Sequence, residues 1–422
     1  MAAALAQAGQ HQQAAAAATD AETEARLIAR PELEAFALAD VAGALAWAGQ
    51  HQQAEDLARS ITDPHWRADA LAGVAAALAQ AGQHLQAEAI ARSITDPDRQ
   101  ATALAKMAEV LAQAGQHLQA EAIARSITDP DRQATALAGV AAVLAWTGLH
   151  LQAEAIAHSI TAPYWQACAL VDVAAGLARA GQSQRAADTA TDAETIARSI
   201  TTNPYAQAEA LAKVAEGLAQ AGRNQRAADI ATDAETIARS ITDPDPDASA
   251  RLGIPDWQAL ALTAAAVALV RTGQHQQAEA AARSITRPSS RPSSLALVAE
   301  ELARAGNHQQ AEAIARSIAF PPDTQGEALA EVAEELARAG NHQQAEAIAR
   351  SISDPDSQAK ALVQVAAVLA QAGKHHPAAR LAAAACTTGK WTTAIRVVLS
   401  LMPSAITTLA RTLEEHDSAQ DP

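Results

Sequence analysis

A short glycine turn recurs eleven times along this chain of 422 residues, and the copies are mostly 33 residues apart. The turn reads Gly-x-His in most copies, and its glycines are Gly9, Gly49, Gly82, Gly115, Gly148, Gly181, Gly222, Gly273, Gly306, Gly340 and Gly373. A fixed period of this length is typical of a stack of one supersecondary unit, whose stability is roughly a sum of contacts between neighbours. Such a stack presents an extended surface and does not by itself build a catalytic pocket.

Residues 97–130 show what one repeat contains. Asp96 is a favoured helix N-cap, and Pro97 follows at the first helical position, where its missing N–H costs nothing. Apolar residues then recur at three- and four-residue steps, at Leu104, Met107, Ala108 and Leu111. Gly115 ends this helix, and a second helix over 117–127 turns Ala120, Ile123, Ala124 and Ile127 inward. The sequence therefore predicts a helix–turn–helix repeat.

The same repeat resembles the tetratricopeptide repeat (TPR), in the bacterial Ala-rich form with a 33-residue period. The resemblance is carried by Leu104-x2-Met107-Ala108-x2-Leu111-x3-Gly115-x-His117-x2-Ala120, and Leu, Val, Ala and His stand where the family has large aromatics. It implies an all-α fold, a right-handed α-solenoid of paired antiparallel helices that forms a TPR-like superhelix. With its weaker copies, the repeat predicts one array over residues 1–388.

The two ends of the chain differ from the array. Residues 389–416 contain no glycine turn and are predicted to form a helical C-terminal cap, followed by a polar tail over 417–422. Met1 stands in the middle of a first helix, so the first repeat is truncated. We therefore expect the chain to be the sensor or scaffold part of a larger bacterial signalling or defence protein; in such proteins, similar arrays follow an effector or nucleotide-hydrolysing domain.

Composition limits the partners and the compartment. A formal net charge of -16 argues against a nucleic-acid or anionic-membrane partner, because both favour a basic face. No apolar run approaches 18 residues, and the N-terminus lacks the pattern of a secretion signal. Cys168 and Cys386 lie far apart and in no metal-like spacing. The expected location is therefore the cytoplasm.

No motif predicts catalysis, a cofactor or a metal. The sequence has no P-loop, Gly-x-Ser-x-Gly elbow, HExxH or dinucleotide-binding turn, so we expect no enzyme. Nine histidines share the position two residues after the turn glycine, but equivalent positions in stacked repeats lie roughly 8–10 Å apart, too far to chelate one ion. We interpret that position as a packing position. The pairs Glu300-Glu301 and Glu334-Glu335 are adjacent on a helix, so each pair is predicted not to share a site.

Binding residues are predicted on the first helix of each repeat, which lines the concave groove of TPR-like stacks. Two residues before the glycine, the chain varies between Trp, Gln and Arg, and six residues before it Glu recurs. The groove-binding candidates are Trp47, Glu109, Trp146, Arg179, Glu216, Arg271, Glu300, Arg304, Glu334 and Arg338. Arginine rows suit peptide backbones and acidic side chains. A solvated helix face explains the same residues, and that alternative stays open.

Two functions from different classes follow. The first is a non-enzymatic protein-interaction scaffold or sensor array that binds a peptide or protein segment in the groove. The alternative is a self-assembling structural repeat protein without a dedicated ligand, which forms a homodimer through the apolar, uncapped end MAAALA. Fraying of that end is an equally simple expectation.

Overall fold

The computed structural model describes residues 11–242, 255–319 and 321–388. These residues form α-helices joined by short turns, and no strand occurs among them. The chain divides into two compact units: unit 1 is Met1–Ile200 with Gln220–Gly222, and unit 2 is Thr201–Ala219 with Arg223–Pro422.

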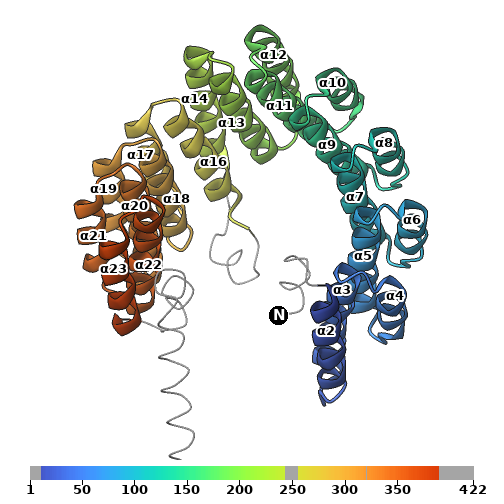
Figure 1. Ribbon diagram of the computed structural model, residues 1–422. Helices are drawn as coiled ribbons and strands as arrows, with labels where there is room; N and C mark the ends of the chain where they lie inside the picture. Colours follow the sequence, from blue (N-terminus) through green and yellow to red (C-terminus); the bar gives the residue numbers. More distant parts are fainter. Residues whose placement is uncertain (1–10, 243–254, 320, 389–422) are drawn as a thin grey trace, which may run out of the picture. The chain divides into compact units, whose positions relative to one another are not determined.

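The helices alternate between the first and second positions of a repeat (Figure 1). The helices up to Ile200 are α2 (His11–Ala25), α3 (Pro31–Trp47), α4 (His51–Ser60), α5 (Pro64–Gln80), α6 (His84–Arg92), α7 (Pro97–Gln113), α8 (His117–Arg125), α9 (Pro130–Trp146), α10 (His150–Ser159), α11 (Pro163–Arg179) and α12 (Ser183–Ser199). The later helices are α13 (Pro204–Gln220), α14 (Asn224–Ser240), α16 (Trp257–Arg271), α17 (His275–Arg283), α18 (Arg291–Arg304), α19 (His308–Ser317), α20 (Pro322–Arg338), α21 (His342–Ser351), α22 (Pro355–Gln371) and α23 (His375–Thr388).

Local capping chemistry sets the ends of these helices, as the sequence predicts. The Asp96 carboxylate accepts a hydrogen bond from the backbone N–H of Arg99 at 2.9 Å, and Pro97 stands at the start of α7. Gly115 has φ of 79°, the left-handed conformation that favours glycine. The N–H of Gln116 then donates to the carbonyl of Leu111, which closes the end of α7. The nine other described turn glycines also have positive φ.

The core of each unit lies between a layer of first helices and a layer of second helices. Successive first helices pack against each other, as α7 does against α5 and α9, and second helices pack between two first helices, as α8 does between α7 and α9. The leucine four residues before each turn glycine is at most 3% exposed, and the alanine five residues after it is fully buried. The all-α fold of TPR-like paired helices is therefore confirmed.

A glutamine joins consecutive repeats in a way that the sequence did not suggest. The Gln133 amide donates to the carbonyls of Arg125 at 2.8 Å and Ile127 at 2.9 Å, at the end of the preceding helix. Gln100 and Gln358 make the same pair of bonds in their own repeats. Because the last carbonyls of a helix have no partner within it, this amide satisfies groups that would otherwise need water.

Several predictions fall on residues outside the described ranges. The helical cap over 389–416, the polar tail over 417–422 and the truncated first repeat with its apolar end are among them. The limits of the array and the homodimer through the N-terminal end therefore stay predictions, as does the handedness of the superhelix.

Candidate functional site

One exposed position recurs on the first helices of both units. The residue two before each described turn glycine is exposed in all ten repeats, although the two positions before it are largely buried. These ten residues, which define the first-helix face, are Trp47, Gln80, Gln113, Trp146, Arg179, Gln220, Arg271, Arg304, Arg338 and Gln371. The array thus presents a variable side chain at a fixed place on a repeated scaffold.

In unit 1, two of the predicted candidates lie against each other. The guanidinium carbon of Arg179, at the end of α11, lies 3.4 Å from the ring centroid of Trp146, at the end of α9. The same guanidinium donates to the carbonyl of Trp146 at 3.2 Å. Trp146 nevertheless remains 55% exposed. The pair is therefore an accessible cation–π stack that holds the indole in one orientation.

Trp47 lines a shallow groove of about 680 Å³ in unit 1, together with His51, Gln80 and several alanines. Trp47 itself is 41% exposed. Burial lowers the pKa of His51, so its imidazole favours the neutral form. This groove therefore offers an aromatic surface bordered by uncharged polar groups.

Glu109 does not join either tryptophan. Its carboxylate accepts a hydrogen bond from Lys106 on the same helix at 3.2 Å. A Cβ added to Gly139 on α9 would lie 3.1 Å from the same carboxylate. Glu109 is therefore a half-buried side chain between α7 and α9, and nothing in its contacts distinguishes it from an ordinary surface residue.

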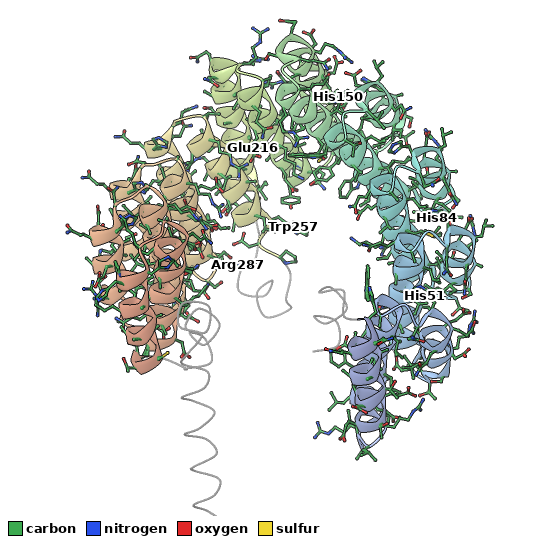
Figure 2. All side chains as sticks on the ribbon, in the orientation of Figure 1. His51, His84, His150, Glu216, Trp257 and Arg287 are labelled. Carbon is green, nitrogen blue, oxygen red and sulfur yellow. The ribbon has the colours of Figure 1, made fainter. Side chains whose placement is uncertain are left out.

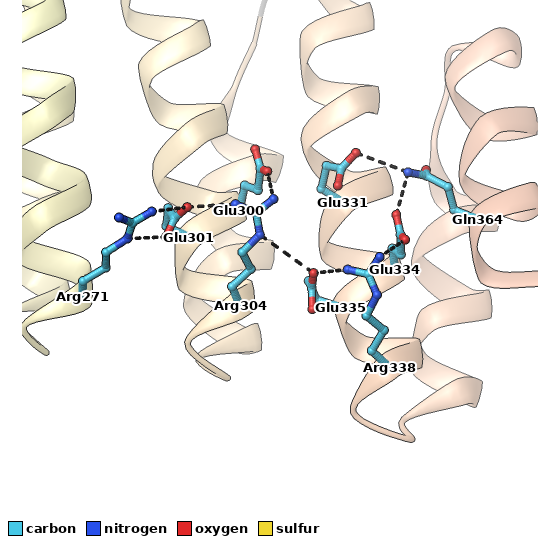
Figure 3. Close-up of polar contacts among 9 residues, drawn as sticks. All are labelled: Arg271, Glu300, Glu301, Arg304, Glu331, Glu334, Glu335, Arg338 and Gln364. Atoms are coloured by element: carbon cyan, nitrogen blue, oxygen red, sulfur yellow. Dashed lines mark hydrogen bonds and ion pairs between the residues drawn. The ribbon is translucent and has the colours of Figure 1, made fainter. Parts of the chain in front are cut away.

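In unit 2, the six predicted candidates lie together. Arg271 on α16 forms an ion pair with Glu216 on α13, and its Nε donates to Glu301 on α18 at 3.1 Å. Arg304 donates to Glu300 and Glu301 on its own helix. Figure 3 shows how this pattern continues to the neighbouring helices.

The rest of the network links α18, α20 and α22. Arg338 forms ion pairs with Glu334 and Glu335, and Glu335 is also 4.0 Å from Nε of Arg304. Gln364 donates to Glu334 at 2.7 Å and to Glu331 at 3.3 Å. The charge ladder of unit 2 consists of Glu216, Arg271, Glu300, Glu301, Arg304, Glu331, Glu334, Glu335, Arg338 and Gln364.

The prediction that adjacent glutamates do not share a site is wrong. Glu300 and Glu301 both bind the guanidinium of Arg304, and Glu334 and Glu335 both bind that of Arg338. Adjacent side chains diverge on a helix, but an arginine three or four residues further on reaches both carboxylates with its two Nη groups. The sequence signal was the pattern Glu-Glu-x-x-Arg, which places one cation at both favourable spacings.

Carboxylates outnumber guanidiniums in the charge ladder by six to three. Burial raises the pKa of Glu216, and nearby Glu301 contributes in the same direction against the pull of Arg271. Burial likewise raises the pKa of Glu334, with contributions from Glu331 and Glu335. For Glu301, two arginines outweigh burial, and the net result is a lowered pKa. The charge ladder therefore contains fewer positively charged side chains than negatively charged ones.

Neutralising two carboxylates of the ladder is expected to have opposite effects on stability. Glu301→Gln should destabilise the fold at pH 7 by about 0.2–1 kcal/mol. The pKa of Glu301 is lowered in the folded state, so its charged form stabilises the fold, and this stabilisation is lost only as the pH falls through the folded pKa. Glu334→Gln should be neutral or slightly stabilising at pH 7, because the folded state disfavours its charged form. Urea unfolding at pH 7 and pH 4 measures both. Equal destabilisation by the two variants at pH 7 would contradict this account.

The repeated histidines lie at the first position of the second helices; Figure 2 shows three of them, His51, His84 and His150, at the equivalent place in their repeats. In seven of them, Nδ1 is buried without a hydrogen-bond partner, and His150 is only 8% exposed. Within the described ranges, no group of three or more His, Cys, Asp or Glu side chains is arranged to hold a metal ion. The imidazoles of these seven residues are thus partly or fully buried at the start of the second helices, and a packing role for them stays a prediction.

Comparison with known proteins yields similarity to structures alone. No protein-family model and no curated protein matches the chain. Solved structures that are similar include the apo form of RapI, with 11% identity over 85% of this chain and 96% of that one and a TM-score of 0.33. A signal-transduction ATPase (STAND) protein with a tetratricopeptide repeat sensor, from Pyrococcus horikoshii, has 12% identity over 86% and 54% of the two chains, with a TM-score of 0.29.

A circular tandem repeat protein with a novel repeat topology is 13% identical over 98% of this chain and 96% of its own length, with a TM-score of 0.25. TM-scores this low assign no functional role to any residue of the chain. None of the described helices is both long and apolar enough to cross a membrane. On the geometry of its own repeats, the chain is a TPR-like helical-repeat protein.

Proposed function

We propose that this chain is a non-enzymatic scaffold that binds protein segments on the first-helix face. The observation that carries the proposal is the exposed position two residues before each turn glycine, which holds Trp or Arg in six of the ten described repeats. Trp and Arg are the residue types most enriched where binding energy concentrates in protein interfaces. A repeated scaffold that varies at an exposed position of each first helix is suited to binding a partner one segment at a time.

The two units favour different chemistry. In unit 1, the Trp146–Arg179 stack and the groove at Trp47 suit apolar or aromatic side chains, because indole faces bury a large area with little loss of entropy. In unit 2, the arginines of the charge ladder are already paired with glutamates of the chain, so they offer little to an acidic segment. The excess of carboxylates favours a segment rich in Lys or Arg.

Peptides selected from a random displayed library test the aromatic part of the proposal. Trp47→Gln with Trp146→Gln should weaken binding of the selected peptides at least about tenfold, as expected for hot-spot tryptophans. Glutamine is the matched choice, because Gln80 and Gln113 occupy this position in neighbouring repeats. The control is Arg59→Gln with Arg283→Gln, which changes second helices only. Unchanged binding by the tryptophan variant would contradict a site on the first-helix face of unit 1.

The same displayed library tests whether the charge ladder of unit 2 prefers peptides rich in lysine and arginine. We expect lysine- and arginine-rich peptides to bind less well to Glu331→Gln with Glu334→Gln. Arg304→Gln with Arg338→Gln should bind them more strongly, because it frees carboxylates. Both effects should shrink at high salt. Selection of acidic peptides, or equal loss in both variants, would overturn the preference for a cationic segment.

A further inference from the structure

Three exposed leucines form a row on the second helices of unit 1. Leu85, Leu118 and Leu151 are 82%, 84% and 73% exposed, although all three lie within well-formed helices. They occupy the same repeat position on α6, α8 and α10, which are successive second helices (Figure 1). Repetition of a large exposed apolar side chain in three consecutive repeats marks a continuous surface. We name these residues the leucine row.

The leucine row is a departure from the rest of the array. The equivalent position is glutamine in the other repeats whose second helix begins with His-Gln-Gln, as in Gln52, Gln276, Gln309 and Gln343. Glutamine at this position is compatible with the fold, since those helices have the same length and bury the same alanines. Packing inside the repeat therefore does not require leucine, and the row calls for another explanation.

A cleft opens beside the central leucine. It has a volume of about 200 Å³ between α8 and α10. Its apolar lining comes from Leu118, Ala155 and the almost fully buried Leu144 and Ile156, and its polar lining includes His117 and Gln152. Glu121 and Arg125, which form an ion pair at 2.8 Å, lie along the same cleft. The surface thus presents a projecting leucine, Leu118, beside a small cleft.

We propose that the leucine row is a homodimer interface, in which Leu118 of each copy inserts into the cleft between α8 and α10 of the other. Stacked helices lie roughly 8–10 Å apart. A two-fold axis parallel to α8, displaced a quarter of this spacing toward α10, places α8 of one copy over the cleft of the other. The relation is reciprocal, as an isologous interface requires. Leu151 then lies over the equivalent position between α6 and α8.

The net charge of the chain and the area of the leucine row both affect whether a second copy of the chain binds this surface. The chain carries a net charge of -16, which opposes self-association over most surfaces. Beside the leucine row, however, the charges are balanced within ion pairs, Glu88 with Arg92 and Glu121 with Arg125. A standard interface buries about 800 Å² on each partner, and three leucines form only its centre. We therefore expect a weak dimer, with a Kd on the order of micromolar.

Sedimentation velocity from about 0.05 µM to about 100 µM tests the proposal, because this range extends well below and well above a micromolar Kd. The full chain should pass from monomer to dimer. Leu85→Gln with Leu118→Gln and Leu151→Gln should raise the Kd at least about tenfold with unchanged helix content. The control is Leu27→Gln, which changes a leucine that is 74% exposed outside the row. A monomer at every concentration, or a dimer that the triple variant leaves intact, overturns the proposal.

Photocrosslinking then locates the contact. A photoreactive phenylalanine analogue at position 118, in a mixture of isotopically light and heavy chains, should give light–heavy crosslinks to residues of α10. Light–heavy products identify contacts between copies, whereas contacts within one chain give unmixed products. Mixed crosslinks that lie mainly in unit 2, or in the first helices, would replace the leucine row with another surface and overturn the inference.

Discussion

Gly176→Ala is expected to destabilise unit 1 by about 1–3 kcal/mol, although alanine favours a helix over glycine. Gly176 is buried in α11, and a Cβ added to it would lie 2.6 Å from the carbonyl oxygen of Ala145 on α9. That oxygen belongs to the backbone, so the two helices must separate. Urea unfolding measures the loss, and hydrogen exchange should show it first in α9 and α11.

The same replacement at Gly43 supplies the matched control. Gly43 lies within α3, and a Cβ there meets nothing within 4 Å. Gly43→Ala should therefore stabilise the chain by about 0.5–1 kcal/mol, which is the conformational entropy gain of alanine in a helix. Gly176 also lies one turn before Arg179, so its variant should disturb the stack on Trp146. Similar effects of the two alanines would contradict the close approach of α9 and α11.

Leu144→Ala should cost about 2–5 kcal/mol, as removal of a fully buried leucine side chain does. Leu144 is 1% exposed on α9, at the position that is leucine in every described repeat. Its removal leaves a cavity between helices that cannot close without moving their backbones. Because repeats in an array depend on their neighbours, a second unfolding transition is expected to appear as the central repeat weakens. Circular dichroism across a urea titration measures it.

Leu118→Ala removes the same atoms from an exposed position. Leu118 is 84% exposed on α8, so its replacement should change the free energy of unfolding by no more than about 0.5 kcal/mol at concentrations where the chain is a monomer. A cost for Leu118→Ala close to that for Leu144→Ala would show that α8 is packed differently from the description above.

Much of the repeat could be predicted from the sequence, because helix ends depend on residues only a few positions apart. Asp96 and Pro97 set the start of α7, and Gly115 sets its end, by bonds to neighbouring backbone groups. The spacing of Leu104 and Leu111 likewise fixes which side of the helix is buried. The exposed positions of Trp47 and Trp146 follow from the same periodicity.

The site was less accessible to sequence reasoning, because the contacts between its helices join residues about 30 or more positions apart. Arg271 was expected to face a ligand, but its register against α18 places it on Glu301. Arg179 was assigned to the same groove as Trp146, yet only the packing of α11 on α9 makes the two a stack. The leucine row is visible in the sequence, but its exposure is set by tertiary packing. Sequence alone thus determined the repeat, its helix ends and its buried face, through local bonds and periodicity. Tertiary structure alone decided which charges are paired between neighbouring helices and which surfaces remain open, because those depend on how neighbouring helices align.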